Sequence, residues 1–577
     1  MSKSFLRYLI ALSCLVAANA SAAERVPYKA MGAPVQPKVA AQWNQYHDGE
    51  ATAALLKALV DGHPERAKLE TLGKSYEGRE LQVITITNFA KGDVQRKPGM
   101  WIDGCIHANE VQATEVCLYT AWFLLEMYGR NELVTRLVDD RVFYILPILS
   151  PDSRDAHFYE PNNTHSPRSG QRPVDDDRDG LIDEDGPDDL DGDGSITRMR
   201  IRDALGRWKE SDDNPGVMVE VKPGERGAFT MLGTEGFDND GDGRVNEDGD
   251  GSYDPNRNWA WNWQPEYVQG GAHQYPFSIL EDRFAADFIT AHANIAGAQS
   301  YHNFGGMILR GPGAKDDGFN GRDLEVMMAI AKEGEKMLPG YRSMNIAEEL
   351  YEVYGGEVDW LYATQGIFPF TNELFSDENY FRKPLDAEHN LDEFNKLLLF
   401  GEGVAAWREV EHPLYGKVEV GGVKKNWRRQ PPSFLLEEEC HRNMAFTFYH
   451  ADQLPQIAFD QIEIQPLRGG LQQITVHVRN ERAIPTRAGF AAERKVTRPD
   501  LLKITGGQLR VIAGLTSDDR FFEQPKEQPR RPAAIRIESI PGHGVIHARW
   551  IVAGTGPFTI EYDSVKAGAV SIEKTLP

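Results

Sequence analysis

Cysteine is scarce in this chain of 577 residues, which contains only four. Loss of an N-terminal segment that includes Cys14 would leave Cys105, Cys117 and Cys440, so at most one intrachain disulfide can form. A framework of bridges is therefore excluded as the basis of the fold. A single Cys105–Cys117 bridge remains allowed in an oxidising compartment.

Excess positive charge is also lacking, because 63 Lys and Arg face 87 Asp and Glu and the net charge is −24. Such a charge repels nucleic acid and anionic membranes and favours a soluble protein that binds cations. Long apolar runs are lacking as well, since no segment beyond the N-terminal region is long and apolar enough to span a membrane.

The first 23 residues predict a secretory signal. Lys3 and Arg7 precede the apolar run Leu9–Ala18, which is too short for a bilayer span and is followed by small residues suited to cleavage. The alternative is an N-terminal anchor helix. We expect a secreted or periplasmic protein in which residues 24–45 form a loose leader.

Alternating strand and helix patterns from residue 46 onward predict an α/β domain over 46–457. Its fold class is a mixed, mainly parallel twisted sheet with helices on both faces. The clearest expected strands are Leu81–Thr87, Met100–Asp103 and Arg141–Leu149, and the clearest expected helices are Glu50–Leu59 and Ala113–Met127. A turn at His412–Gly416 is expected to mark the exit from this unit.

The last part of the chain has the two-residue period of half-buried strands. Ile474, Val476 and Val478 alternate with polar residues, as do other apolar residues up to Val552, and Gly- and Pro-containing turns separate the runs. This pattern predicts an all-β domain, a sandwich, over 458–577.

Two acidic stretches interrupt the first domain, at about 170–200 and 235–254, and we interpret them as insertions. Each repeats Asp at alternate positions followed by Gly and an apolar residue, which suits the oxygen ligands and the tight turn of a calcium loop. They resemble the calcium loops of thrombospondin type 3 repeats, although disordered acidic loops are the alternative. The expected calcium ligands are Asp175, Asp177, Asp179, Asp183, Asp189, Asp191, Asp193, Asp238, Asp240 and Asp242.

A histidine and a glutamate three residues apart follow one of the expected strands. His107-Ala-Asn-Glu110 would let an imidazole and a carboxylate reach one metal ion from a loop, but this pair alone is weak evidence. Further motifs stand in a fixed order, the first of them before this pair and the others after it, and together they resemble the zinc carboxypeptidase A family over roughly residues 45–410. The motifs are Gly73–Arg79, Asp254–Trp259, Ser300–His302, Tyr351–Trp360 and Phe370–Glu373.

The resemblance implies a zinc site and a general base. His107, Glu110 and His302 would be the zinc ligands, and Asp254 would orient His107 through its second ring nitrogen. Glu373 matches the family's catalytic glutamate, which takes a proton from the attacking water and passes it to the leaving amine.

Substrate-binding residues are implied in the same way. Arg257, with Asn256 beside it, matches the anchor of the substrate's C-terminal carboxylate, and Tyr351 matches a tyrosine that closes over it. Val358 matches the position at the floor of the family's specificity pocket, where valine would favour apolar or aromatic C-terminal residues.

One more arginine of the family polarises the scissile carbonyl and stabilises the oxyanion. Arg200 is our candidate, and Arg198 and Arg202 are close competitors. The long insertion leaves open which of the three corresponds to the family's arginine. The chain also departs from the family at Asn109, where many relatives carry an arginine that helps to bind extended peptide.

The predicted function is a secreted zinc exopeptidase that acts on the C-terminal ends of peptides. Two alternatives stay open: a carboxypeptidase for peptidoglycan peptides or an amide deacylase on the same fold, and a non-catalytic, calcium-stabilised binding protein. The expected cofactors are zinc and calcium, and the expected partners are peptide substrates.

Overall fold

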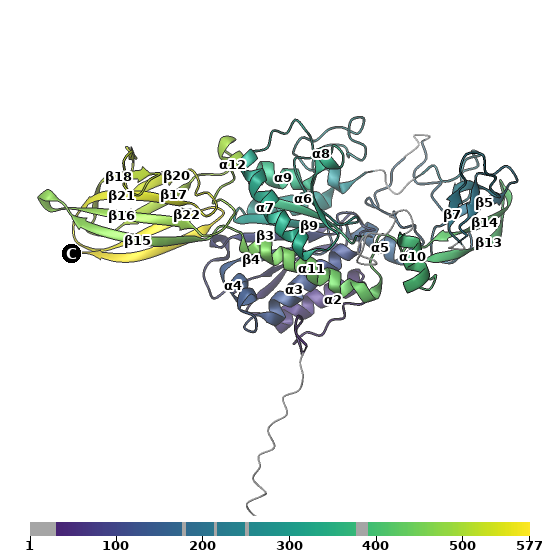
Figure 1. Cartoon of the computed structure of the whole chain (residues 1–577), viewed down its shortest axis with the longest axis horizontal. Coiled ribbons are helices and arrows are strands. Elements are labelled where there is room, and N and C mark those ends of the chain that lie inside the picture. The colour runs from purple at the N-terminus through teal and green to yellow at the C-terminus, as the bar shows by residue number, and fades with distance from the viewer. Residues whose placement is uncertain (1–29, 176–179, 213–215, 249–252, 377–389) are drawn as a thin grey trace, which may run out of the picture.

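The computed structural model describes residues 30–175, 180–212, 216–248, 253–376 and 390–577. A central α/β body lies between a small sheet at one end and an elongated pair of sheets at the other (Figure 1). The expected signal over 1–23 and the expected ligands Asp177 and Asp179 lie outside the described residues.

The central body is built on an eight-stranded mixed sheet. Its inner strands β4, β3, β9 and β12 run parallel, whereas β1, β2 and β10 each have an antiparallel neighbour. This confirms the predicted fold class. In spatial order the strands are β1 (Ala67–Lys74), β2 (Glu80–Ile86), β4 (Val142–Leu146), β3 (Gly99–Gly104), β9 (Ile295–Asn303), β12 (Phe368–Leu374), β10 (Met307–Arg310) and β11 (Arg342–Asn345).

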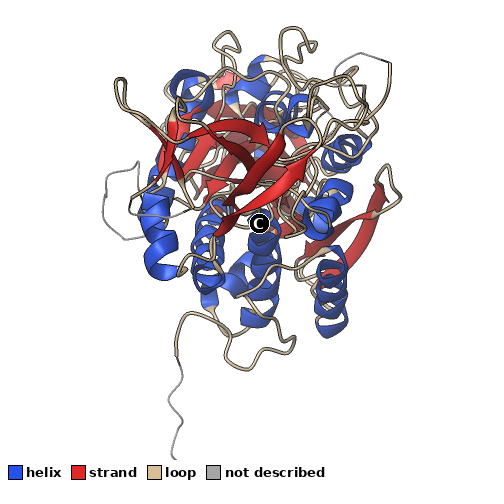
Figure 2. Cartoon of the chain, turned by 90° about the vertical axis from the view of Figure 1, so that its right-hand side faces the viewer, coloured by secondary structure: helices blue, strands red, loops and turns tan. Residues whose placement is uncertain are grey.

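Both faces of this sheet are buried, because alternate residues of one strand enter different cores. On β3, Met100 and Ile102 pack into one apolar cluster, whereas Trp101 between them packs into the other. Helices lie above and below the strands (Figure 2). Helices α2 (Gly49–Gly62), α3 (Gln112–Met127), α4 (Glu132–Asp140), α7 (Gly321–Met337) and α11 (Ser433–Asp452) contribute to the first cluster, and α6 (Leu280–Ala291) and the middle of α9 (Glu357–Gln365) to the second.

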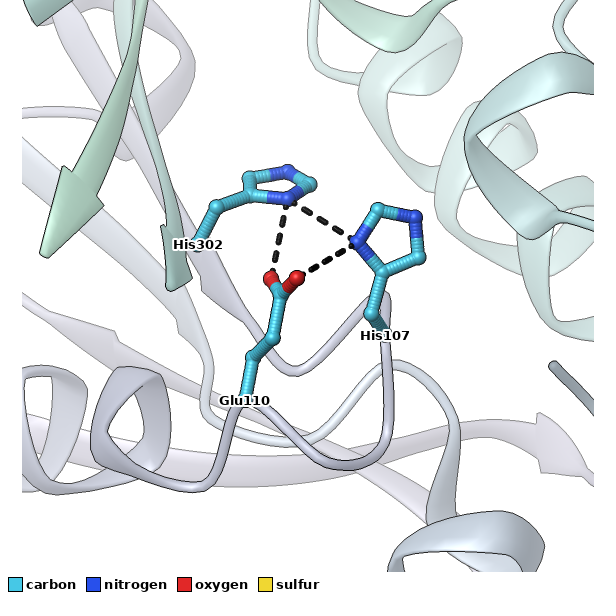
Figure 3. A group of neighbouring side chains, drawn as sticks. All are labelled: His107, Glu110 and His302. Carbon is cyan, nitrogen blue, oxygen red and sulfur yellow. Dashed lines mark hydrogen bonds and ion pairs between the residues drawn. The ribbon is translucent and has the colours of Figure 1, made fainter. Parts of the chain in front are cut away.

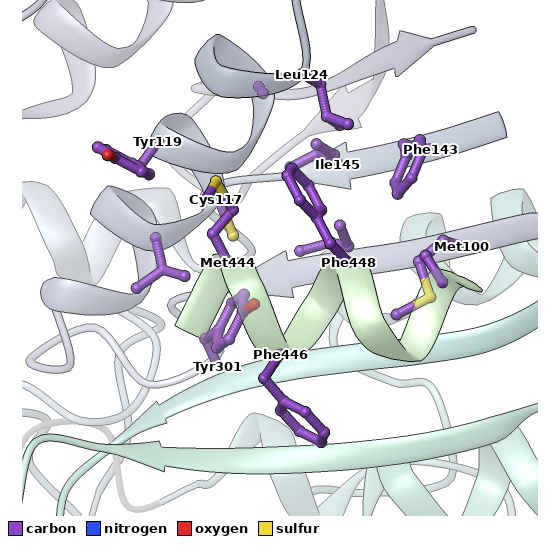
Figure 4. Packing of buried hydrophobic residues seen from close by; sticks show 14 of the residues in the cluster. Met100, Cys117, Tyr119, Leu124, Phe143, Ile145, Tyr301, Met444, Phe446 and Phe448 are labelled. Atoms are coloured by element: carbon purple, nitrogen blue, oxygen red, sulfur yellow. The ribbon is translucent and has the colours of Figure 1, made fainter. Parts of the chain in front are cut away.

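Helix α11 returns the chain to this core after the turn at His412–Gly416. Its Met444, Phe446 and Phe448 join the cluster that contains α3 and the face of β3 and β4 (Figure 4). The expected exit from the unit at this turn is therefore wrong. The turn joins two strands of a separate sheet, and the chain afterwards completes the α/β body.

The chain between the two acidic insertions forms part of a second, six-stranded sheet. A small apolar core of Met199, Val418 and Val420 holds it together. Strands from two distant parts of the sequence pair here: β13 (Val404–His412), β14 (Gly416–Val423), β5 (Arg198–Arg202), β8 (Phe229–Thr234), β6 (Trp208–Glu210) and β7 (Met218–Glu220), in that order. We call these six strands the insertion sheet.

The C-terminal region is a β sandwich, as its two-residue period predicts. The first sheet has the order β15 (Ile457–Pro466), β16 (Leu471–Asn480), β21 (Val545–Ala553), β18 (Arg510–Ser517) and β19 (Lys526–Glu527). The second has the order β20 (Ala534–Ile537), β17 (Asp500–Thr505), β22 (Gly556–Ser564) and β23 (Gly568–Leu576). Inward residues such as Val476, Trp550 and Ile560 form their common core.

The sandwich is attached to the α/β body through the turn between β22 and β23. Lys566, which is 4% exposed, donates from Nζ to the carbonyl oxygen of Ile295 at the start of β9 (2.5 Å). Gly568 has a φ of 73°, and a Cβ there would lie 2.1 Å from the carbonyl oxygen of Arg96. The turn therefore requires glycine in order to approach the body closely.

Burial of Lys566 makes the free energy of unfolding depend on pH. Desolvation lowers the pKa of this amine from 10.5 to about 7. Between these values the unfolded chain binds the additional proton, so stability rises with pH from 7 to 10.5 and the full penalty of roughly 3–5 kcal/mol applies below pH 7.

We expect Lys566→Met to raise the unfolding temperature more at pH 6 than at pH 10, as measured by calorimetry. Lys526→Met, at an exposed position, is the control; an equal shift at both pH values would contradict this account.

The described cysteines Cys105, Cys117 and Cys440 are buried and unpaired, so the Cys105–Cys117 bridge that the sequence allows does not form. Among the described residues, the structure contains no helix with the length and apolar character of a membrane span.

Candidate metal centre and active site

Three neighbouring parallel strands bring the chemically active side chains to one edge of the central sheet. His107 follows β3, and His302 lies near the end of β9. Glu373 on β12 is paired in register with His302. The carboxyl ends of parallel strands are the usual ligand-binding edge of an α/β sheet, so the arrangement follows from the order of the strands.

His107, Glu110 and His302 converge on one point (Figure 3). The Nδ1 atoms of the two histidines lie 3.2 Å apart, and each lies 3.1 Å from one oxygen of the Glu110 carboxylate. All three residues are at most 2% exposed. Burial by itself raises the pKa of Glu110, but the charges of the two imidazoles outweigh it and hold the pKa well below the usual value.

These donors fit a zinc ion. Ligands at bond lengths of about 2.0–2.2 Å around a tetrahedral ion are separated by about 3.3 Å, which is close to the separations among these three side chains. Two ring nitrogens and one carboxylate oxygen are also the donor types that zinc prefers.

Asp254 orients the first of these ligands. Its Oδ1 lies 2.9 Å from Nε2 of His107. Because the carboxylate accepts a hydrogen bond from Nε2–H, the lone pair of Nδ1 is left facing the other two ligands. Although burial opposes it, the charges of Arg257 and His107 keep the pKa of Asp254 well below its usual value.

The carboxyl group of Glu373 lies beside the metal ligands without belonging to their group. Desolvation and the negative charge of Glu110 raise the pKa of Glu373 to about 7 in the metal-free chain. A carboxyl group balanced in this way suits proton transfer near neutral pH.

The chain matches a family model described as zinc carboxypeptidase over residues 52–179 and 234–394, which together are half of its length. These segments contain His107, Glu110, Asp254, His302 and Glu373. The chain belongs to the zinc carboxypeptidase family. It is accordingly a zinc metallocarboxypeptidase. Residues 456–575, the sandwich, match a family described only as a domain of unknown function.

Relatives of this zinc carboxypeptidase include carboxypeptidase B of Astacus astacus, which is 24% identical over 59% of this chain and 89% of the relative. Carboxypeptidase A2 of Mus musculus is 23% identical over 60% of this chain and 66% of the relative. Among solved structures, thrombin activatable fibrinolysis inhibitor has a TM-score of 0.43 and 18% identity, covering 73% of this chain and 80% of that chain. Carboxypeptidase A from Helicoverpa armigera has a TM-score of 0.41 and 18% identity, covering 68% and 78%.

Arg168, which was not among the predicted site residues, is one of two arginines that contact the metal ligand Glu110 of the carboxypeptidase. Its Nη1 lies 3.0 Å from Oε1 of Glu110, and its Nε lies 3.5 Å from Oδ2 of Asp254. Arg168 lies 58 positions after Glu110 and before the first acidic insertion. Its position in the chain relative to Glu110 was therefore the available signal. Burial opposes the charged form, but nearby Asp254, Glu110 and Glu373 raise the pKa of Arg168 above the usual value.

Arg200 is not brought to the site, which corrects the prediction. It is 2% exposed in the insertion sheet, where Glu210 and Glu419 each bind its guanidinium at 2.7 Å. The group also stacks on the rings of Phe229 and Trp407. Its competitors Arg198 and Arg202 lie on the same strand, β5, so none of the three replaces Arg168.

Of the expected substrate-binding residues, Arg257 is linked to the metal ligand His107 through Asp254. Arg257 lies 3.9 Å from Asp254, and Asn256 accepts a hydrogen bond from the backbone of Glu357. Tyr351 is 52% exposed, in the segment between α8 (Ile346–Glu349) and α9. Val358 is 7% exposed and belongs to an apolar cluster with Leu309, Met344, Ile346 and Val353.

A second arginine, Arg429, reaches the centre from the segment between β14 and α11. Its Nη2 lies 3.3 Å from Oε1 of Glu110, and its Nη1 lies 3.1 Å from Nδ1 of His165. The neighbouring Gln430 donates to the carbonyl oxygen of Asn109. A guanidinium thus stands near Asn109, although the local sequence there lacks an arginine.

The acidic segments interlock, because residues of one complete carboxylate groups of the other. Three groups have oxygens within 4.8 Å: Asp185 with Asp238 and Asp240; Asp189 with Asp191 and Glu235; and Asp240 with Asp242 and Glu247. Asp185, Glu235 and Glu247 were not among the predicted ligands. Of the predicted ones that the structure describes, Asp175, Asp183 and Asp193 belong to none of the three groups.

Proposed function

We propose that this zinc carboxypeptidase removes apolar or aromatic residues one at a time from the C-terminal ends of peptides. The observation that carries the proposal is the position of Arg257. Its guanidinium lies 3.9 Å from Asp254, which also contacts His107. A substrate carboxylate held by Arg257 would therefore lie close to the metal ligands.

The apolar preference rests on the cluster around Val358. Met307 packs against this cluster and is paired with Glu373 across β10 and β12. The side chain of the last substrate residue would therefore meet apolar carbon near the general base. An acidic residue at Val358 would instead favour a basic C-terminal residue.

In the proposed mechanism, Arg257 binds the terminal carboxylate in a two-pronged geometry and Tyr351 covers it. Arg168 donates to the scissile carbonyl oxygen as negative charge develops there. Glu373 removes a proton from the attacking water and delivers it to the leaving nitrogen. Zinc, when held by His107, Glu110 and His302, lowers the pKa of water and polarises the carbonyl group.

Mass spectrometry of a peptide mixture tests this function. The zinc-loaded protein should produce ladders of peptides that have lost successive C-terminal residues, fastest where that residue is Phe, Leu or Tyr. Peptides with an amidated C-terminus should resist, because Arg257 would have no carboxylate to bind. Internal cleavage, or ladders that are equally fast with Lys and Arg ends, would contradict the proposal.

We also propose that the protein is exported. The charged start and short apolar run within residues 1–23 support this proposal, and a processed N-terminus detected in the periplasm or medium would test it.

We further propose that calcium binds between the acidic segments. Both carboxylate oxygens of Glu247 are buried without a hydrogen-bond partner, and burial together with Asp185 raises the pKa of Glu247 to about 7. Carboxylates gathered in this way repel one another unless a cation joins them, and calcium takes six to eight oxygens.

Calcium should therefore stabilise the insertion sheet. At a calcium concentration 100 times its Kd, the free energy of unfolding should rise by about 2.7 kcal/mol, which calorimetry of zinc-loaded protein with and without calcium would detect. Asp240→Asn, which alters two carboxylate groups, should weaken the response, whereas Asp61→Asn at an exposed site should not. The same unfolding temperature with and without calcium would disprove calcium binding.

A further inference from the structure

A groove of about 470 Å³ lies between the insertion sheet and the segment next to the metal centre. We propose that it holds the residues that precede the scissile bond in longer peptides and selects apolar or aromatic side chains there. This inference rests on the proposed exopeptidase function and adds a second point of selection to it.

The insertion sheet supplies apolar walls. Trp208 on β6, Met218 on β7, Met231 on β8 and Trp407 on β13 line the groove and are all partly exposed. Trp407 is fixed by its Nε1, which donates to the carbonyl oxygen of Gly216 (2.8 Å), so its ring is a rigid surface. Partly exposed aromatic and methionine side chains that meet in a concave site are typical of ligand-binding pockets.

The opposite wall is next to the catalytic centre. His165 lines the groove and contacts Arg429, which in turn contacts Oε1 of Glu110. Arg257, in contrast, is linked through Asp254 to His107. A peptide anchored at Arg257 would cross the metal ligands and continue on the Glu110 side, where the groove begins.

The charge of the groove fits a peptide backbone. Although the chain has a net charge of −24, neither Asp nor Glu is found among the described residues that line the groove, whereas Arg198 and Arg428 are. The guanidinium groups of Arg198 and Arg428 can donate hydrogen bonds to peptide carbonyl oxygens there.

Most of the groove lies outside the part of the chain that matches the family model. Trp208, Met218 and Met231 fall between the two matched segments, and Trp407 and Arg428 follow the second. The insertion sheet thus adds to the metal site a binding surface formed mainly by residues outside the family match.

Two blocked hexapeptides with the same C-terminal Ala-Gly-Phe test the inference, one with Leu-Phe-Leu and one with Ser-Gly-Ser before it. The intact enzyme should release Phe from the apolar peptide with a kcat/KM at least about tenfold higher. Trp208→Ala should reduce this ratio to near one, whereas Leu205→Ala, at an exposed residue of the turn between β5 and β6 and outside the groove, should leave it unchanged.

The ratio of the two peptides does not depend on the amount of folded enzyme, so partial unfolding of a variant cannot imitate the result. Equal kcat/KM values for both peptides with the intact enzyme, or a ratio that persists in Trp208→Ala, would overturn the inference. If neither peptide loses its phenylalanine, the proposed function itself fails.

Discussion

Replacing Glu373 by Gln should lower kcat/KM by about 10²–10⁴-fold while the zinc content stays at one ion per chain. The glutamine amide has the shape of the Glu373 carboxyl group and keeps the same position opposite His302. It cannot, however, accept the proton of the attacking water. Zinc should remain, because His107, Glu110 and His302 form the ligand group without Glu373.

Steady-state kinetics on a peptide that ends in Phe, together with metal analysis, provides the measurement. Glu70→Gln, on the exposed face of β1, is the matched control and should retain full activity. A Glu373→Gln enzyme with activity within tenfold of the original would remove the general base from the mechanism. Loss of zinc in this variant would instead show that Glu373 is needed for metal binding.

The second large effect should follow from Arg168→Ala. Removing a donor to a developing oxyanion costs about 10²–10³-fold in kcat, and Arg168 is placed for this role by its contact with Glu110. The effect should appear mainly in kcat, because the donor acts most strongly on the charge of the transition state.

Arg200→Ala distinguishes this role from the one that the sequence suggested. Its side chain joins Glu210 to Glu419 within the insertion sheet, so its loss should lower thermal stability and leave kcat for a short substrate within about threefold. A large fall in kcat for Arg200→Ala with an unchanged one for Arg168→Ala would reverse the assignment.

The elements of the central sheet were predictable because their sequence patterns are local. Strand β4, for example, is a continuous apolar run, as expected when both faces are buried, and helix α3 follows the loop that contains His107 and Glu110. The motifs around His302 and Glu373 each end a strand of this kind, and the order of strands then places them together.

Other contacts could not be predicted, since they join residues far apart in the chain. Arg429 is 319 positions from Glu110, and β14 pairs with β5 although the two strands are separated by most of the α/β body. No periodicity or spacing encodes such pairings. The acidic segments show the same limit: their repeats were visible, but Glu235 and Asp185 complete carboxylate groups across the gap between them.

The attachment of Lys566 to Ile295 has a consequence for biosynthesis. Strand β9 contains His302 near one end, and the turn between β22 and β23 contacts its other end. This turn is synthesised after helix α11. Domains ordinarily fold in the order of their synthesis. Here the metal-binding strand gains this supporting contact only after residue 566 has been synthesised, so proteolytic activity should arise late in biosynthesis rather than on a short nascent chain.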